Sequence, residues 1–194
     1  MNKRGLFITF EGVDGCGKST QVKKFVDYLF GLDKHNTVIL TREPYKEVSI
    51  RKILRESSNP LEDAERLANL FVNDRKQHCE ELILPSLEKG LFVVSDRFKL
   101  STIAYQSAQG LPIEKMIAMH EGLPIPDITF IVDITAEAAS QRMKKEAGRN
   151  EHKFEANTDF VRKIREMYLK APSLLKNEKI IVIDGTKDVE SVFE

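Results

Sequence analysis

The glycine-rich segment Gly12–Ser19, with the sequence GVDGCGKS, constrains the fold of this chain most strongly. It follows the apolar run Leu6–Phe10, and apolar side chains recur at helical spacing between Val22 and Leu29. The pattern G-x-x-x-x-G-K-[ST] between a strand and a helix is typical of a loop whose backbone N–H groups cradle phosphate oxygens. The helix N-terminus adds its positive dipole end to the same site. The segment therefore predicts ATP or GTP binding, and a turn that binds no ligand is the alternative.

Two residues of this segment have separate expected roles. Lys18 supplies a positive charge to the phosphates, and the hydroxyl of Ser19 is a ligand for Mg²⁺. The motif alone does not separate kinases, ATPases and GTPase switches, although the sequence has no convincing N-K-x-D run for guanine selection. The residues predicted to bind the nucleotide are Gly12, Val13, Asp14, Gly15, Cys16, Gly17, Lys18, Ser19 and Thr20.

Short apolar runs recur along the chain with longer helical patterns between them. Runs of this kind indicate strands that are buried on both faces, and the alternation indicates a parallel sheet covered by helices. We therefore predict an α/β fold of the P-loop NTPase type, with a five-stranded parallel sheet, helices on both faces and one domain over residues 1–194. The expected strands are Leu6–Phe10, Val38–Leu40, Phe92–Val94, Ile128–Val132 and Ile180–Ile183.

The longest helical pattern begins at Asn59-Pro60-Leu61-Glu62. Asn59 suits an N-cap, Pro60 the first helical position and Glu62 the reciprocal cap. The helix is expected to run to about Leu87, with Pro85 as a point where it can bend. The charged stretch at about 143–154 is expected to form a short mobile lid.

Composition limits the classes of partner. Thirty Lys and Arg balance thirty Asp and Glu, so the chain lacks the basic excess of a nucleic-acid binder. Cys16 and Cys79 do not form a C-x-x-C pair or a disulfide framework, which favours a reducing compartment. No apolar run has membrane-spanning length, and the first residues lack the features of a signal peptide. We expect a soluble cytoplasmic protein.

Polar residues for an acceptor follow the third expected strand. Asp96 and Arg97 come at its carboxyl end, where ligands bind in open α/β sheets. Arg97 can hold a phosphate bidentately and Asp96 can reach a metal ion, directly or through water. A purely structural Asp-Arg pair is the alternative.

Phe71 and Arg75 lie one helical turn apart and share a face of the long helix. An aromatic ring can stack on a pyrimidine while a guanidinium donates to a base carbonyl. Core packing by Phe71 and a solvated charge at Arg75 are the alternatives.

Several segments in order resemble the thymidylate kinase family of nucleoside monophosphate kinases: FEGVDGCGKST, TREP, LFVNDR, DRFKLSTIAYQ, PDITF and the KFE near position 154. The resemblance spans nearly the whole chain. It implies that Arg51 and Arg97 hold the dTMP phosphate, that Tyr105 excludes a 2′-hydroxyl and that Arg75 bonds O4 of thymine. The full set of implied acceptor residues is Asp14, Arg42, Glu43, Arg51, Phe71, Arg75, Arg97, Thr102, Tyr105 and Gln106.

On the ATP side, the resemblance implies that Arg142 lies beside adenine, with the loop that contains Lys187 on the other side. Position 15 is Gly, so the chain resembles the type that takes its catalytic cation from the lid. Arg149 and Lys153 are both available for this role, beside Lys18 and Arg97. Where many members have Gly-Gly after TREP, this chain has Tyr45-Lys46.

The implied activity is transfer of the γ-phosphate of ATP to dTMP, which gives dTDP and ADP in dTTP biosynthesis. Mg²⁺ is the implied metal ion, and a homodimer is the implied assembly. Two alternatives remain at this stage. One is a kinase for another pyrimidine acceptor, and the other is a nucleotide sensor without transfer activity.

Overall fold

The structure is a computed structural model that describes residues 4–56, 63–145 and 157–194. The strands are β1 (Phe7–Glu11), β2 (Val38–Arg42), β3 (Phe92–Asp96), β4 (Ile128–Asp133) and β5 (Ile180–Asp184). The helices are α1 (Lys18–Leu32), α2 (Val48–Glu56), α3 (Ala64–His78), the π-helical segment η1 (Cys79–Ile83), α4 (Leu84–Glu88), α5 (Lys99–Ala108), α6 (Ile113–Ala118), α7 (Ala136–Lys145), α8 (Thr158–Leu174) and α9 (Val189–Phe193).

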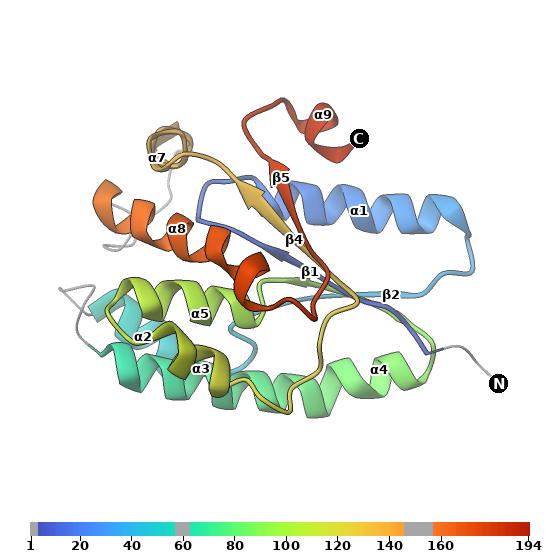
Figure 1. Ribbon diagram of the computed structural model, residues 1–194. Coiled ribbons are helices and arrows are strands. Elements are labelled where there is room, and N and C mark those ends of the chain that lie inside the picture. Colours follow the sequence, from blue (N-terminus) through green and yellow to red (C-terminus); the bar gives the residue numbers. More distant parts are fainter. Residues whose placement is uncertain (1–3, 57–62, 146–156) are drawn as a thin grey trace.

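The five strands form one parallel sheet in the order β2-β3-β1-β4-β5. Each expected strand is present within two residues of its predicted bounds, so the predicted α/β fold is confirmed. The strand that precedes the glycine-rich loop is the central one, and β3 lies directly beside it (Figure 1). The carboxyl ends of β1 and β3 therefore lie next to each other at the same end of the sheet.

Helices cover both faces of the sheet, with α1 and α9 on one side and α3, α4 and α5 on the other (Figure 1). The alternation of side chains along β1 explains the two cores. Ile8 and Phe10 belong to a cluster that includes Val22 of α1, whereas Phe7 belongs to a cluster with Ile83 of the long helix. Both cores position β1 and hence the loop that follows it.

The prediction that every strand is buried on both faces is wrong for the two edge strands. Leu40 in β2 is 51% exposed and Val182 in β5 is 43% exposed, whereas all five residues of β1 are buried. An edge strand has a neighbour on one side only, and helices cover it less completely. An apolar run in the sequence therefore does not distinguish a central strand from an edge strand.

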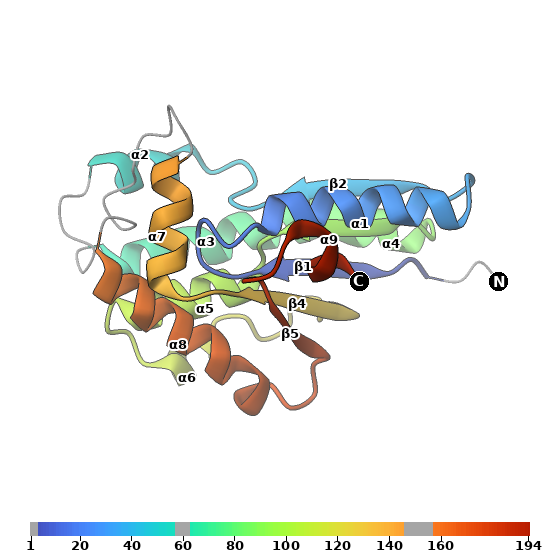
Figure 2. The same ribbon diagram turned by 90° about the horizontal axis from the view of Figure 1, so that it is seen from above.

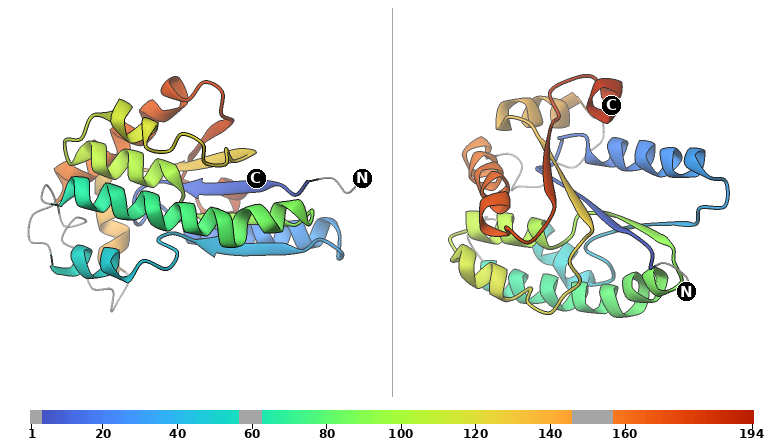
Figure 3. Two further views of the ribbon diagram at one scale, coloured as in Figure 1. Left: turned by 90° about the horizontal axis from the view of Figure 1, so that it is seen from below. Right: turned by 45° about the vertical axis from the view of Figure 1, so that its right-hand side comes forward.

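Segments α3, η1 and α4 form one long continuous helix along the sheet (Figure 3). It ends at Glu88, next to the predicted end, and the proposed cap at 59–62 lies outside the described residues. The π-helical segment comes just before Pro85, where the Leu84 N–H donates to the Cys79 carbonyl. A π-helical turn adapts the backbone to a proline, which lacks an N–H and crowds the preceding turn.

The helices α2 and α7 lie beyond the carboxyl ends of the strands, so they border the end of the sheet where the glycine-rich loop turns (Figure 2). Residues 143–145 of the expected lid belong to α7, and residues 146–154 lie outside the described residues. In the part of the chain that the structure describes, no helix combines the length and apolarity needed to cross a membrane.

Candidate active site

The glycine-rich loop curls tightly between β1 and α1. Gly12 has φ of 137°, and a Cβ atom there would lie 2.5 Å from the Val132 carbonyl oxygen, so only glycine fits. The Lys18 ammonium folds back into the curl, where it donates to the Val13 carbonyl at 2.9 Å and lies 3.9 Å from the Asp14 carboxylate. The loop therefore places one buried cation at the N-terminus of α1.

Helix α7 packs directly on this loop. A Cβ atom at Gly15 would lie 2.8 Å from the Ala139 carbonyl oxygen and 2.9 Å from Met143, and φ is 78°. Position 15 thus has no room for an arginine. Arg142 of α7 donates to the carbonyls of Cys16 at 3.3 Å and Gly185 at 2.9 Å, which joins the loop to the turn after β5. The exposed Lys187 follows in that turn.

A hydroxyl and a carboxylate meet where α1 begins. The Ser19 Oγ donates to Oδ2 of Asp96 at 2.8 Å, across from β3. Both are hard oxygen donors of the kind that Mg²⁺ prefers, so the donor set fits that ion. Mg²⁺ usually takes few protein ligands beside phosphates and water, so a pair of oxygen donors is of the kind that such a site needs.

A cavity of about 210 Å³ opens beside the loop. It is lined by Asp14, Arg42, Glu43, Pro44, Leu54, Leu67, Phe71, Arg75, Arg97, Ser101, Thr102, Tyr105, Gln106 and Gln109. Of the residues expected to bind the acceptor, all but Arg51 line it. Arg51 is exposed on α2, whose buried face carries Ile50 and Ile53.

Arg97 lies between the loop and the cavity. Its guanidinium contacts the Asp14 carboxylate at 2.5 Å and donates to the hydroxyls of Ser101 at 2.9 Å and Tyr168 at 3.3 Å. Burial by itself lowers its pKa, but Asp14 and the nearby phenols raise the pKa well above its usual value. Its backbone has φ of 75°, an uncommon conformation for a non-glycine residue, and Ser95 donates to its carbonyl oxygen at 2.7 Å. Arg97 is therefore a permanently charged group held in a specific place.

Glu11 shares two hydroxyl partners with Arg97, those of Ser101 and Tyr168, and sequence reasoning missed this residue. It is fully buried and accepts hydrogen bonds from the Phe98 backbone N–H at 2.8 Å and the Ser101 hydroxyl at 2.6 Å. The Tyr168 hydroxyl donates to it at 3.3 Å. Burial raises the pKa of this carboxyl. The residue stands directly before the glycine-rich loop, and no local pattern marks its partners at positions 98–101.

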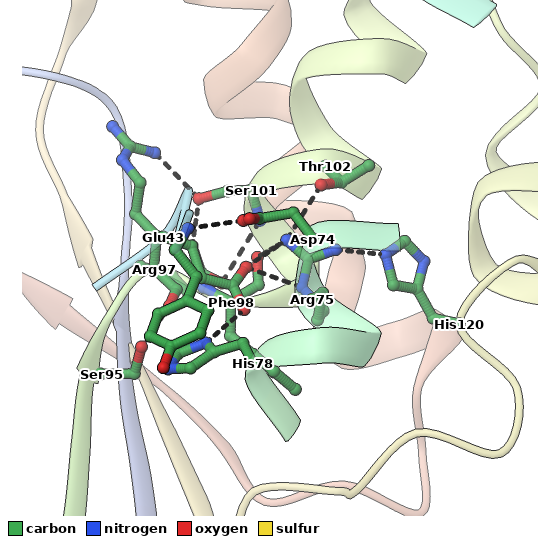
Figure 4. Close-up of polar contacts among 12 residues, drawn as sticks. Glu43, Asp74, Arg75, His78, Ser95, Arg97, Phe98, Ser101, Thr102 and His120 are labelled. Carbon is green, nitrogen blue, oxygen red and sulfur yellow. Dashed lines mark hydrogen bonds and ion pairs between the residues drawn. The ribbon is translucent and has the colours of Figure 1, made fainter. Parts of the chain in front are cut away.

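Arg75 is a buried side chain with 1% exposure, so the alternative of a solvated charge is wrong. Its Nε donates to Glu43 at 2.7 Å, and its Nη2 donates to Glu43, the Phe98 carbonyl and the Thr102 hydroxyl. Its Nη1 contacts Nε2 of His120 at 2.6 Å, as Figure 4 shows. The guanidinium is fixed on the cavity wall by charge and hydrogen bonds.

Two further residues that sequence reasoning missed hold the segment after TREP. Asp74 accepts backbone hydrogen bonds from Tyr45, Lys46 and Glu47 at 2.5, 2.7 and 2.8 Å. His78 contacts Glu43 at 3.1 Å, and the Tyr45 ring stacks on its imidazole with centroids 4.4 Å apart. The Tyr45-Lys46 pair is thus anchored on the long helix, where Lys46 also forms an ion pair with Glu81.

The rest of the cavity wall combines an aromatic ring with amides. Phe71 packs against the cluster of Ile50, Ile53 and Leu67 and also lines the cavity, so it serves in the core as well. Nε2 of Gln106 donates to Gln109 at 3.0 Å. Its Oε1 is buried and has no hydrogen-bond partner among the described residues. A buried acceptor without a partner is costly, so it indicates a ligand that donates to it.

Arg149 and Lys153, the cations expected in the lid, lie outside the described residues. Cys16 and Cys79 are both buried free thiols. Taken together, the glycine-rich loop, the Ser19–Asp96 pair and the adjoining arginine-lined cavity define a phosphotransferase of the P-loop class.

Comparison with known proteins narrows this class. The family model described as thymidylate kinase matches residues 10–194. The thymidylate kinase of Thermosipho melanesiensis is 43% identical over 195 residues, which cover 97% of this chain and 94% of that protein. The thymidylate kinases of Thermoanaerobacter sp. strain X514 and Mycoplasma capricolum are each 38% identical, over 97% of this chain and over 94% and 91% of their own lengths. The chain belongs to the thymidylate kinase family.

Proposed function

We propose that this protein transfers the γ-phosphate of ATP to the phosphate of dTMP and releases dTDP and ADP. The observation that carries this proposal is one cavity that holds Arg97 next to the nucleotide loop and the pair Arg75 and Gln106 on its wall. Family membership points to the same reaction. Neither the comparisons nor the cavity supports a kinase for a different acceptor or a sensor without transfer activity.

The base is read by one donor and one acceptor. Thymine presents the O4 acceptor and the N3–H donor side by side. Arg75 has an N–H on Nη1 beyond the one that faces His120, and Gln106 has the unpartnered Oε1, so the two match that pattern. Cytosine presents an amino donor at position 4 and an acceptor at N3, which would oppose both groups. Phe71 would stack on the ring, and Thr102 borders the same wall.

The sugar and phosphate would lie toward the loop. The Tyr105 hydroxyl donates to the Asp14 carboxylate at 3.3 Å, and these two side chains would close the cavity around the deoxyribose. Arg97 is the bidentate phosphate ligand beside them, with Arg42 and Glu43 on the same lining. Arg51 would contribute from α2 if that helix moves when the acceptor binds.

In the proposed step, a phosphate oxygen of dTMP attacks the γ-phosphorus, the bond from that phosphorus to the bridging β,γ-oxygen breaks, and ADP departs with the electron pair. No general base is needed, because the acceptor phosphate is already ionised near neutral pH. Lys18, Arg97 and the lid cations Arg149 or Lys153 would neutralise the two anions, and lid closure over about 143–154 would exclude water. Ser19 and Asp96 would hold Mg²⁺, which offsets phosphate charge when bound. Arg142 and Lys187 would flank adenine.

Two properties of the whole molecule are proposed with this function. By analogy with the family, we propose a homodimer that acts in the cytoplasm, with the chain 1–194 as one domain. Light scattering coupled to size-exclusion chromatography tests the assembly, since a mass of about 22.2 kDa would indicate a monomer instead.

To test the activity, ADP formation is measured with ATP, Mg²⁺ and each of five candidate acceptors: dTMP, dUMP, dCMP, UMP and thymidine. We expect strong activity with dTMP, weaker activity with dUMP and little with the other three. An Arg97→Ala variant should lose most of the activity with dTMP and still bind ATP. Preference for thymidine or UMP would contradict the acceptor assignment, and ATP binding without any transfer would favour the sensor.

A further inference from the structure

The buried contact between Arg75 and His120 joins the cavity wall to a residue outside it. His120 lies in the turn after α6, is 5% exposed and does not line the cavity. Its Nδ1 lies 2.6 Å from the Met116 carbonyl oxygen, and its Nε2 lies 2.6 Å from Nη1 of Arg75 (Figure 4). These two contacts determine which ring nitrogen of His120 carries the hydrogen.

The tautomer of His120 follows from its partners. A carbonyl oxygen only accepts, so Nδ1 carries the hydrogen. A guanidinium only donates, so Nε2 must offer its lone pair. The imidazole is therefore neutral, and burial together with the charge of Arg75 lowers the pKa of His120 to about 3, which keeps it neutral at physiological pH.

The other contacts of Arg75 hold the opposite side of the guanidinium. Glu43 accepts from Nε and Nη2, and the Phe98 carbonyl and Thr102 hydroxyl also face Nη2. Nη1 has two hydrogens, and His120 is its only hydrogen-bond partner in the described part of the chain. With one hydrogen held by His120, the second is left for an acceptor in the cavity that Arg75 lines.

We propose that His120 is a positioning residue for base specificity: it holds Nη1 of Arg75 so that one N–H is directed at the O4 carbonyl of the pyrimidine. The inference rests on the proposed contact between Arg75 and the base. His120 does not touch the substrate in this account. It acts through Arg75, so its loss should change the choice of base more than the use of ATP.

The test compares dTMP with 5-methyl-2′-deoxycytidine monophosphate, which keeps the 5-methyl group but has an amino group in place of O4 and an acceptor in place of the N3–H donor. The measured quantity is the ratio of kcat/KM for the two acceptors in the wild type, in His120→Leu and in His120→Gln. Glutamine places an acceptor oxygen near the position of Nε2, whereas leucine removes the acceptor. The exposed His35 gives the matched control, His35→Leu.

We expect His120→Leu to lower this ratio about tenfold, as for loss of a hydrogen bond to a charged group, with the KM for ATP unchanged. His120→Gln should keep most of the ratio, and His35→Leu all of it. If His120→Leu does not fold, His120→Asn replaces it, because its shorter amide cannot reach Arg75 in the same way.

An unchanged ratio in His120→Leu or His120→Asn would overturn the inference, and so would an equal loss of the ratio in His120→Gln and His120→Leu. A wild type that does not prefer dTMP over the methylcytosine nucleotide would instead overturn the base contact proposed for Arg75. The two failures are therefore distinguishable.

Discussion

The glycine-rich loop and the acceptor cavity lie side by side, but they are built in different ways. The loop is contiguous in sequence, and its site consists of backbone groups and the nearby side chains of Lys18 and Ser19. The cavity is assembled from side chains of separate elements, such as Glu43, Arg75 and Thr102, which are buried and hydrogen-bonded to one another. Recognition of phosphate can thus be encoded locally, whereas recognition of one base depends on long-range contacts.

The largest effect should come from the loop and should not depend on the acceptor. We expect Lys18→Ala to lower kcat about 10³-fold with dTMP and with dUMP alike, because the proposed role of this cation is to neutralise the phosphates of ATP. Lys23→Ala, on the exposed side of α1, serves as control and should change little. ADP formation measures both. A loss confined to dTMP would mean that Lys18 belongs to the acceptor side.

The loop also depends on its contact with α7. We expect Gly15→Arg to reduce the free energy of unfolding by about 3 kcal/mol, since a side chain there meets Ala139 and Met143 and the positive φ becomes strained. The control Gly31→Arg lies at a glycine with open space around its Cβ position. Urea denaturation measures both variants. A stable and fully active Gly15→Arg protein would show that α7 does not restrict this position.

On the cavity side, substitution of Asp74 tests whether a residue that does not line the cavity helps to hold the cavity wall in place. Asp74→Ala removes the acceptor of three backbone N–H groups, so we expect a loss of about 2 kcal/mol in the free energy of unfolding and a higher KM for dTMP. The exposed Asp27 provides the control Asp27→Ala. The account would be contradicted if the KM for ATP rose instead of the KM for dTMP.

The smallest of these effects is the contribution of the buried His120 to the dependence of stability on pH. The pKa of His120 is about 3 when folded, against 6.5 for an unperturbed histidine. The unfolded chain therefore binds a proton that the folded protein does not, so this stabilisation is complete above pH 6.5 and is lost as the pH falls.

Between pH 7 and pH 5.5 the loss from His120 should be about 1 kcal/mol. Denaturation of the wild type and of His120→Gln at both pH values isolates this contribution, because the variant lacks the titrating group. Equal pH dependence in the two proteins would argue against a buried neutral imidazole.

The same difference between the two regions explains what the sequence could predict. The loop, the parallel sheet and Asp96-Arg97 at a strand end follow from local patterns and from the geometry of α/β sheets. The pair Phe71 and Arg75 follows from helical spacing, but spacing left open whether Arg75 was solvated. Its burial depends on Glu43 and His120, which lie 32 and 45 residues away in sequence.

Other features had no local signal at all. Glu11 meets Ser101 across 90 residues, and Asp74 reaches the backbone of Tyr45 across 29. The exposure of Leu40 depends on the position of β2 at the edge of the sheet, which only the strand order reveals. Such contacts are set by the tertiary structure and not by the pattern of nearby residues.

The most direct test of the account is calorimetric titration of dTMP, and of a non-hydrolysable ATP analogue, into the wild type and Gln106→Leu. The substitution removes the buried Oε1 that has no described partner, so we expect dTMP affinity to fall about tenfold while the melting temperature and the affinity for the ATP analogue stay close to wild type. That result would show that the cavity recognises the base through side chains that do not belong to the glycine-rich loop. Unchanged dTMP affinity, or equal loss of both affinities, would contradict this central claim.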